Sequence, residues 1–149
     1  MRSLTLHVAV GIRLIHGYDI VIQVLEMGQR VVVVDDDREI RDALKDALED
    51  AGYEVFVVSN GLRLLKVLSV WRPDVILLDV MMSWIDGVGL CEALKQNPQF
   101  RDIPVVFISA RTDKSDIDRG LAAGAIDYVA KPFDLPDLLS RLDHITHAA

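Results

Sequence analysis

One feature constrains the fold more than any other. From Arg30 onward, short apolar runs alternate with stretches of amphipathic helical spacing. The first run, "RVVVVD", contains consecutive valines, which is typical of a parallel strand covered on both faces. Similar runs follow it along the chain. The sequence therefore predicts strands at residues 30–35, 53–58, 74–79, 104–109 and 125–130.

A helical segment follows each predicted strand and carries ordinary start or stop signals. Apolar residues recur on one stripe from Ile40 to Ala51, and Gly52 ends this first helix. Asn60 precedes a second helix that reaches about Val70. The remaining helices are predicted at residues 87–96, at 114–125 and from the capping residue Asp134 onward.

Strand and helix alternating in this way imply an α/β fold. We expect a five-stranded parallel sheet with helices on both faces and right-handed crossovers, because sequential βα units pack in that manner. In such sheets ligands bind outside the carboxyl ends of the strands, where the strand order reverses. The side chains at those strand ends are therefore the candidates for a functional site.

Composition narrows the class of protein. With 149 residues, 51% of them hydrophobic, the chain suffices for one compact domain. Its net charge of −7 argues against a nucleic-acid or anionic-membrane surface and favours a basic partner or a bound cation. No apolar run is long enough for a membrane span. The single cysteine, Cys91, fits a reducing compartment such as the cytoplasm, and its helical apolar position predicts burial.

Polar side chains stand at the ends of four predicted strands. Asp35 and Asp36 follow the first strand, Asp79 ends the third, Ser109 ends the fourth and Lys131 follows the fifth. Carboxylates that converge at one edge repel one another, and a hard cation such as Mg²⁺ removes that repulsion. The lysine and the hydroxyl suit an anion, and a carboxylate can accept a phosphoryl group. The pattern predicts a site that holds a phosphoryl group beside a carboxylate.

The motifs "VVVVDDD", "ILLDVMM", "FISA" and "YVAKPF" resemble those of the receiver domain of two-component response regulators, in its stand-alone form. The resemblance covers about 120 residues, from Arg30 to the C-terminus. It implies a flavodoxin-like (βα)5 doubly wound fold for residues 30–149.

The resemblance also implies roles for single residues. Asp79 would be the phospho-acceptor. Asp36 would bind Mg²⁺ directly, Asp35 directly or through water, and the remaining protein ligands would be Asp79 and the backbone carbonyl of Met81.

Three further positions match the family's phosphoryl-binding and switch residues. Ser109 and Lys131 would each contact a phosphoryl oxygen. Tyr128 would turn inward when Ser109 moves toward the phosphate. The Lys131-Pro132 peptide bond would be cis.

The function implied is a signalling switch rather than an enzyme. A sensor histidine kinase or a phosphotransfer protein would donate the phosphoryl group, and slow loss of that group would be the only reaction the protein itself catalyses. Because the chain ends one helix after the fifth strand, we expect output through a separate partner protein or a phosphorelay. The protein would be a monomer or a weak homodimer.

One loop departs from the family pattern. Ser83 and Trp84 replace a proline and a glycine that commonly precede the "IDG" turn, which leaves open the alternative of an unphosphorylated pseudo-receiver that acts as a docking module. A phosphatase of the haloacid dehalogenase type is excluded, because it needs a second acid where this chain has Met81. A flavin or nucleotide binder would need a glycine- or hydroxyl-rich loop in place of the aspartates after the first strand.

Ordinary structural roles compete with the functional ones. Asp37 is interpreted as a helix N-cap. Tyr128 has the alternative of a half-buried sheet aromatic. Taken alone, Lys131 would be a surface lysine and Ser109 a strand-end serine. His144 and His147 share a helical face, but no matching ligands accompany them, so a solvated helix end is the preferred interpretation.

Residues 1–29 do not belong to the βα pattern. Charged and histidine residues interrupt their apolar run, which argues against a signal peptide. The stretch "YDIVIQVLEM" fits an extra strand or a short helix lying on the domain. A simpler interpretation is that Met27 is the natural start, with a loosely packed extension before it.

Overall fold

A computed structural model describes most of the chain. The described residues are 9–15, 19–25, 28–83 and 85–147. Two positions on which sequence predictions depend, Met27 and Trp84, lie outside the described residues.

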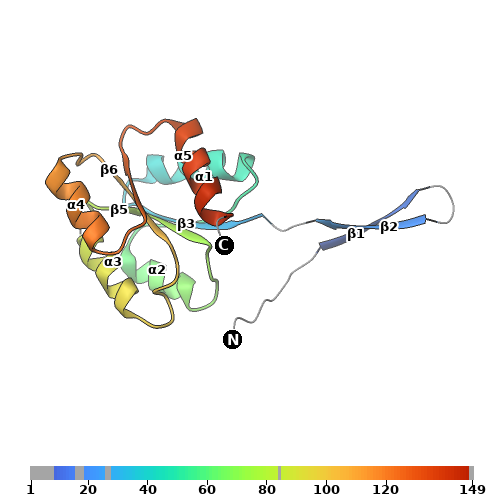
Figure 1. The fold of residues 1–149 in the computed structure, drawn as a ribbon, viewed down its shortest axis with the longest axis horizontal. Helices are drawn as coiled ribbons and strands as arrows, with labels where there is room; N and C mark the ends of the chain where they lie inside the picture. The colour runs from blue at the N-terminus through green and yellow to red at the C-terminus, as the bar shows by residue number, and fades with distance from the viewer. Residues whose placement is uncertain (1–8, 16–18, 26–27, 84, 148–149) are drawn as a thin grey trace.

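The centre of the fold is a parallel sheet of five strands with the order β4-β3-β5-β6-β7 (Figure 1). The strands are β3 (Arg30–Val34), β4 (Glu54–Val58), β5 (Val75–Asp79), β6 (Val105–Ser109) and β7 (Asp127–Ala130). The chain moves outward from β3 to β4, then returns past β3 to build β5, β6 and β7. This is the flavodoxin-like order, so the predicted fold is confirmed.

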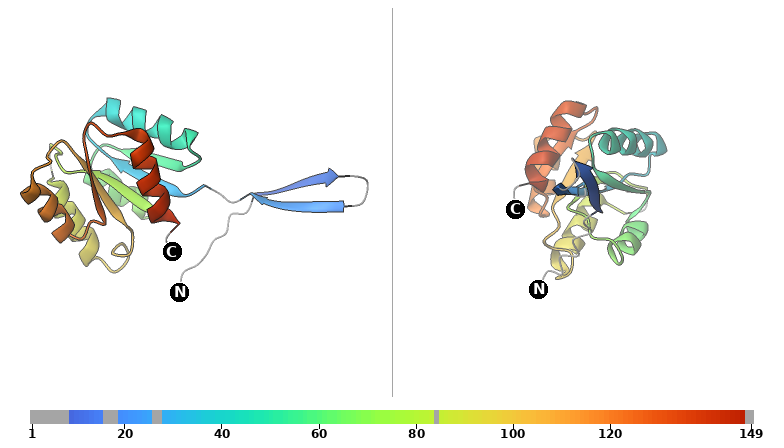
Figure 2. Two further views of the ribbon diagram at one scale, coloured as in Figure 1. Left: turned by 45° about the horizontal axis from the view of Figure 1, so that its top comes forward. Right: turned by 90° about the vertical axis from the view of Figure 1, so that its right-hand side faces the viewer.

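Helices cover both faces of the sheet (Figure 2). They are α1 (Arg38–Asp50), α2 (Gly61–Leu68), α3 (Gly87–Gln96), α4 (Lys114–Ala122) and α5 (Leu135–Thr146). Buried residues of α1 and α5 pack in one cluster, and those of α2 and α3 pack in another on the opposite side. The domain therefore has three layers, helices, sheet and helices. The loops after the strands lie outside these layers and can form a site.

Alternate valines of β3 pack in the two clusters. Val32 and Val34 lie in the cluster with α2 and α3, whereas Val31 and Val33 lie in the one with α1 and α5. All four are almost fully buried. A strand of this kind is stabilised on both faces, because each fully buried side chain contributes about 1.5–3 kcal/mol. Its fixed position in the sheet also determines the position of the aspartates that follow it.

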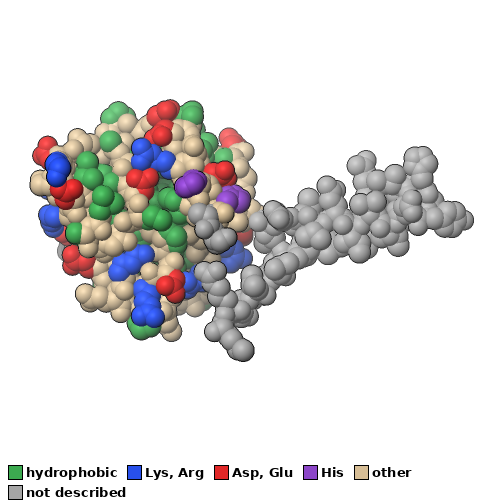
Figure 3. Space-filling view, in the orientation of Figure 1, with side chains coloured by type: hydrophobic (Ala, Val, Ile, Leu, Met, Phe, Trp, Pro, Cys, Tyr) green, Lys and Arg blue, Asp and Glu red, His purple; other side chains and the backbone are tan. Residues whose placement is uncertain are grey.

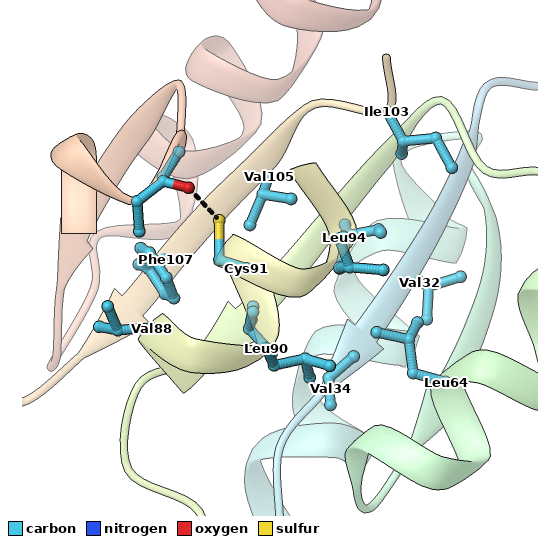
Figure 4. Packing of buried hydrophobic residues seen from close by; sticks show 14 of the residues in the cluster. Val32, Val34, Leu64, Val88, Leu90, Cys91, Leu94, Ile103, Val105 and Phe107 are labelled. Atoms are coloured by element: carbon cyan, nitrogen blue, oxygen red, sulfur yellow. Dashed lines mark hydrogen bonds between the residues drawn. The ribbon is translucent and has the colours of Figure 1, made fainter. Parts of the chain in front are cut away.

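Cys91 is a packing residue, as predicted. It is fully buried on α3 among leucines and valines, and its Sγ lies 3.6 Å from the carbonyl oxygen of Ala123 (Figure 4). Burial raises the pKa of its thiol, which keeps it protonated and unreactive.

The predicted helix at 114–125 ends earlier than expected. Helix α4 stops at Ala122 because Gly124 adopts a left-handed backbone conformation with φ of 107°. Strand β7 consequently begins at Asp127 rather than at residue 125. Helix α2 also ends before Val70, at Leu68.

Before the domain, β1 (Ala9–Ile15) and β2 (Asp19–Leu25) form an antiparallel pair. Of the two alternatives for the second segment, an extra strand or a short helix, the strand is present, but it pairs with residues 9–15 and not with the five-stranded sheet. Within the described ranges, none of the helices combines the length and the hydropathy that a membrane span requires.

Candidate functional site

The candidate site lies at the carboxyl edge of the sheet, where the strand order reverses. β3 and β5 are neighbours, and β6 lies next to β5, so the ends of these strands are adjacent. The structure brings Asp35, Asp79 and Ser109 together at this edge, each of them buried. Lys131 reaches the same place from the end of β7. The prediction that these side chains converge at one edge of the sheet is therefore confirmed, whereas their functional roles stay predictions.

Three carboxylates form a compact group. One oxygen from each of Asp35, Asp36 and Asp79 lies within 4.8 Å of the others. Asp35 and Asp79 are buried, whereas Asp36 is exposed at the mouth of the group. Oxygen ligands at this spacing suit a hard divalent cation that retains several waters.

Lys131 lies against the two buried acids. Its Nζ donates to Asp35 Oδ2 at 2.8 Å and lies 3.7 Å from Asp79 Oδ1. The other oxygen of Asp35 accepts from the backbone N–H of Asp37 at 2.9 Å. The Met81 N–H donates to Asp79 Oδ1 at 3.2 Å. The ammonium group of Lys131 and two backbone N–H groups thus orient the two buried carboxylates and leave part of the Asp79 carboxylate free.

The exposed acid is held by a residue that the sequence marked only as a departure from the family pattern. Ser83 Oγ donates to Asp36 Oδ2 at 2.8 Å, and the Ser83 N–H donates to the same oxygen at 3.3 Å. The two residues are 47 positions apart, so no local pattern could have linked them.

The surroundings of Asp79 disfavour the ionised form of its carboxyl group. Burial, followed by the negative charge of Asp35, raises the pKa of Asp79 from 3.8 to about 6, and the attraction to Lys131 offsets only part of that rise. Perturbed carboxylates of this kind cluster at functional sites. A cation bound to the group would remove part of the repulsion.

Ser109 and Tyr128 both form hydrogen bonds with the backbone of Arg111. Ser109 Oγ accepts from the Arg111 N–H at 3.0 Å, and the Tyr128 hydroxyl donates to the Arg111 carbonyl at 2.6 Å. The Tyr128 ring is half-buried, with its centroid 5.9 Å from that of Phe107. Glycine at position 120 of α4 permits this packing, since a Cβ there would lie 3.0 Å from both rings. No motif in the sequence pointed to this role of the Arg111 backbone.

Other predictions concern residues at the margin of the site. Asp37 caps α1, accepting from the Glu39 N–H at 2.9 Å, so it is a cap as predicted. The Lys131-Pro132 bond is cis, as predicted. Met81 is half exposed and pairs with Asp86 in an isolated bridge beside the site, and the role of its carbonyl stays a prediction.

His144 and His147 were considered as a possible metal pair. His147 is the C-cap of α5, and its Nδ1 lies 3.1 Å from Oδ1 of Asp143 on the same helix. Among the described residues, Asp35, Asp36 and Asp79 are the group with suitable metal-ligand spacing, and neither histidine belongs to it. On the face shown in Figure 3, basic and acidic side chains are interspersed without a large area of one sign.

Comparison with known proteins decides the family. The profile of the response regulator receiver domain matches residues 31–143. The chain belongs to the response regulator receiver family. Its receiver domain is 40% identical over 116 residues to the response regulator MprA of Mycobacterium ulcerans, a match covering 78% of this chain and 49% of that protein. The chain therefore spans about half the length of the curated relatives it matches.

Solved receiver structures are similar in fold. The receiver domain of the Francisella response regulator 1452 shares 31% identity with a TM-score of 0.74, covering 80% of this chain and 97% of that one. The chemotaxis response regulator CheY4 of Vibrio cholerae also shares 31% identity with a TM-score of 0.74, over 79% and 98% of the two chains. The protein thus contains a receiver domain of two-component signalling, and its three clustered aspartates have a spacing that suits a metal ion.

Proposed function

We propose that this receiver domain is a phosphorylation switch in which Asp79 accepts a phosphoryl group from the phosphohistidine of a sensor histidine kinase or a phosphotransfer protein. One observation carries the proposal. A buried carboxylate at a strand end lies beside two further acids and 3.7 Å from the ammonium group of Lys131. The acids suit a cation, and the ammonium group suits the oxygens of an incoming phosphoryl group.

In the proposed step, an oxygen of the Asp79 carboxylate attacks phosphorus in line with the leaving group. The new O–P bond forms as the P–N bond of phosphohistidine breaks, and the bonding electrons stay on the imidazole nitrogen. The three transferred oxygens carry the charge of the transition state, so positioning and charge neutralisation supply most of the catalysis. Lys131 would neutralise one oxygen, and the Ser109 hydroxyl would donate to another.

The metal required for this step would be Mg²⁺. Asp36 would bind it directly, Asp35 directly or through water, and Asp79 and the Met81 carbonyl would complete the protein ligands. When bound, the ion neutralises charge on the phosphoryl oxygens. The donor set fits, since all three side chains offer carboxylate oxygens and one of them, Asp36, is open to solvent.

Phosphorylation would bias a two-state element that runs from Ser109 to Tyr128. At present the Ser109 hydroxyl accepts from the Arg111 N–H, and the Arg111 carbonyl accepts from Tyr128. When Ser109 moves to donate to the phosphoryl group, it leaves the Arg111 N–H, and the segment that carries the Tyr128 contact must rearrange. The surface of α4, β7 and α5 would then differ between the two states and select the partner that carries the output.

A histidine kinase makes phosphohistidine from ATP, so we place this encounter in the cytoplasm. Because the chain covers about half of its curated relatives, the proposal concerns the receiver domain and its switch.

The test is the intact mass of the protein after incubation with acetyl phosphate, with and without Mg²⁺, for the wild type and for Asp79→Asn. We expect a Mg²⁺-dependent gain of one phosphoryl group that the variant does not show. A folded wild type that gains nothing would favour the docking-module alternative.

A further inference from the structure

Each acid of the site is oriented by a different donor. Lys131 and a backbone N–H hold Asp35, and another backbone N–H holds Asp79. Asp36 differs because it is exposed, so its side chain has no surrounding wall to fix its rotamer. Among the described residues, Ser83 supplies both hydrogen bonds to the Asp36 carboxylate.

The chemistry of position 83 gives these two bonds their meaning. Both end on one oxygen, Oδ2, so the remaining oxygen of Asp36 stays free for a cation. A proline, which the family commonly has at this position, carries neither an N–H nor a hydroxyl and would make neither bond. A chain with proline at this position would therefore lack both contacts.

We propose that Ser83 is a positioning residue for the metal, an inference that rests on the function proposed above. By fixing the Asp36 carboxylate, it removes rotamer freedom that the cation would otherwise have to restrict on binding. Hydrogen-bonded partners of metal ligands commonly act in this way.

The same contact joins two loops that both contribute to the site. Asp36 lies in the loop after β3, and Ser83 lies in the loop after β5. The second loop also contains Met81, whose N–H already holds Asp79. Ser83 thus connects the exposed ligand to the loop that follows the acceptor, so hydrogen bonds orient the ligands from both loops before the ion binds.

The experiment is a MgCl2 titration of the full, ¹⁵N-labelled chain, followed by the shifts of backbone amides in the two loops. Four proteins are compared: the wild type, Ser83→Ala, Ser83→Thr, and Ser140→Ala as a control at an exposed serine of α5. Ser83→Ala loses the hydroxyl bond and keeps the N–H bond. We expect its Mg²⁺ dissociation constant to rise about three- to ten-fold. This effect is at or below the low end of the range usual for hydrogen-bonded partners of metal ligands, because Asp36 is exposed.

The threonine variant separates a positioning role from a structural one. It keeps the hydroxyl, so its affinity should stay within about two-fold of the wild type, as should that of the Ser140 control. Equal or tighter Mg²⁺ binding by Ser83→Ala would overturn the inference, and so would weak binding by both the alanine and the threonine variants. A wild type that binds no Mg²⁺ would remove the proposed metal site as well, so the two failures are distinguishable.

Discussion

Replacing Asp79 with asparagine should stabilise the metal-free protein. Asp79 ionises in the folded protein only against burial and the charge of Asp35, which raise its pKa from 3.8 to about 6. That difference corresponds to about 3 kcal/mol at neutral pH. Asparagine keeps the size of the side chain and removes its charge, while Lys131 keeps its 2.8 Å contact with Asp35. We therefore expect Asp79→Asn to be more stable by about 2–3 kcal/mol at pH 7.5.

The pH dependence follows from the direction of the shift. Because the folded pKa lies above the unfolded one, between about pH 4 and pH 6 the folded protein holds a proton that the unfolded chain has released. The stability of the wild type relative to the variant therefore falls as the pH rises through that window, and it levels off above it. Near pH 4 the two proteins should be equally stable with respect to this group.

Urea unfolding in EDTA at pH 4.5, 6 and 7.5, followed by circular dichroism, measures the effect. Asp46→Asn is the matched control, since Asp46 is exposed on α1 and should change the free energy of unfolding by less than about 0.5 kcal/mol. The reasoning is refuted if Asp79→Asn is no more stable than the wild type at pH 7.5, or if its advantage is as large at pH 4.5.

Three other predictions follow from the same geometry. Gly87→Ala would place a Cβ against the carbonyl oxygen of Asp79, so we expect a loss of about 3 kcal/mol in urea unfolding, and an unchanged midpoint would contradict the packing described. Lys131→Met should raise the pKa of Asp79 further above about 6, measured by carboxyl ¹³C shifts, whereas a fall would show that Lys131 does not act on it. Mg²⁺ at ten times its dissociation constant should increase the free energy of unfolding of the wild type by about 1.4 kcal/mol and so raise its melting temperature. The melting temperature of Asp36→Ala should rise much less. Equal gains would place the ion elsewhere.

The sequence predicted the fold because local and global signals agree in this domain. The valines of β3 mark a strand covered on both faces, and the predicted span of α3, 87–96, matches the observed one. Helix α4 was predicted too long because apolar spacing continues through Ala123, whereas the turn at Gly124 is set by its backbone conformation. The pairing of residues 9–15 with 19–25 was not predicted, although the three residues between the two runs include a glycine, which is a known hairpin signal.

The site was predictable to the level of strand ends and no further. That rule brought Asp35, Asp79 and Lys131 to one edge, as the structure confirms. It could not show that Ser83 binds Asp36, because the contact joins two separate loops. Nor could it show that the backbone of Arg111 connects Ser109 with Tyr128, because the N–H and carbonyl groups involved are the same whatever the side chain.

The central claim is that Asp79 itself accepts the phosphoryl group, and borohydride reduction followed by peptide mapping tests it most directly. Sodium borohydride reduces an acyl phosphate to an alcohol, so a phosphorylated aspartate becomes homoserine and is located by mass spectrometry. After treatment with acetyl phosphate and Mg²⁺, we expect homoserine at position 79, and none when Mg²⁺ is omitted. Homoserine at position 35 or 36, or at no position in a protein that had gained a phosphoryl group, would contradict the assignment of Asp79 as the acceptor.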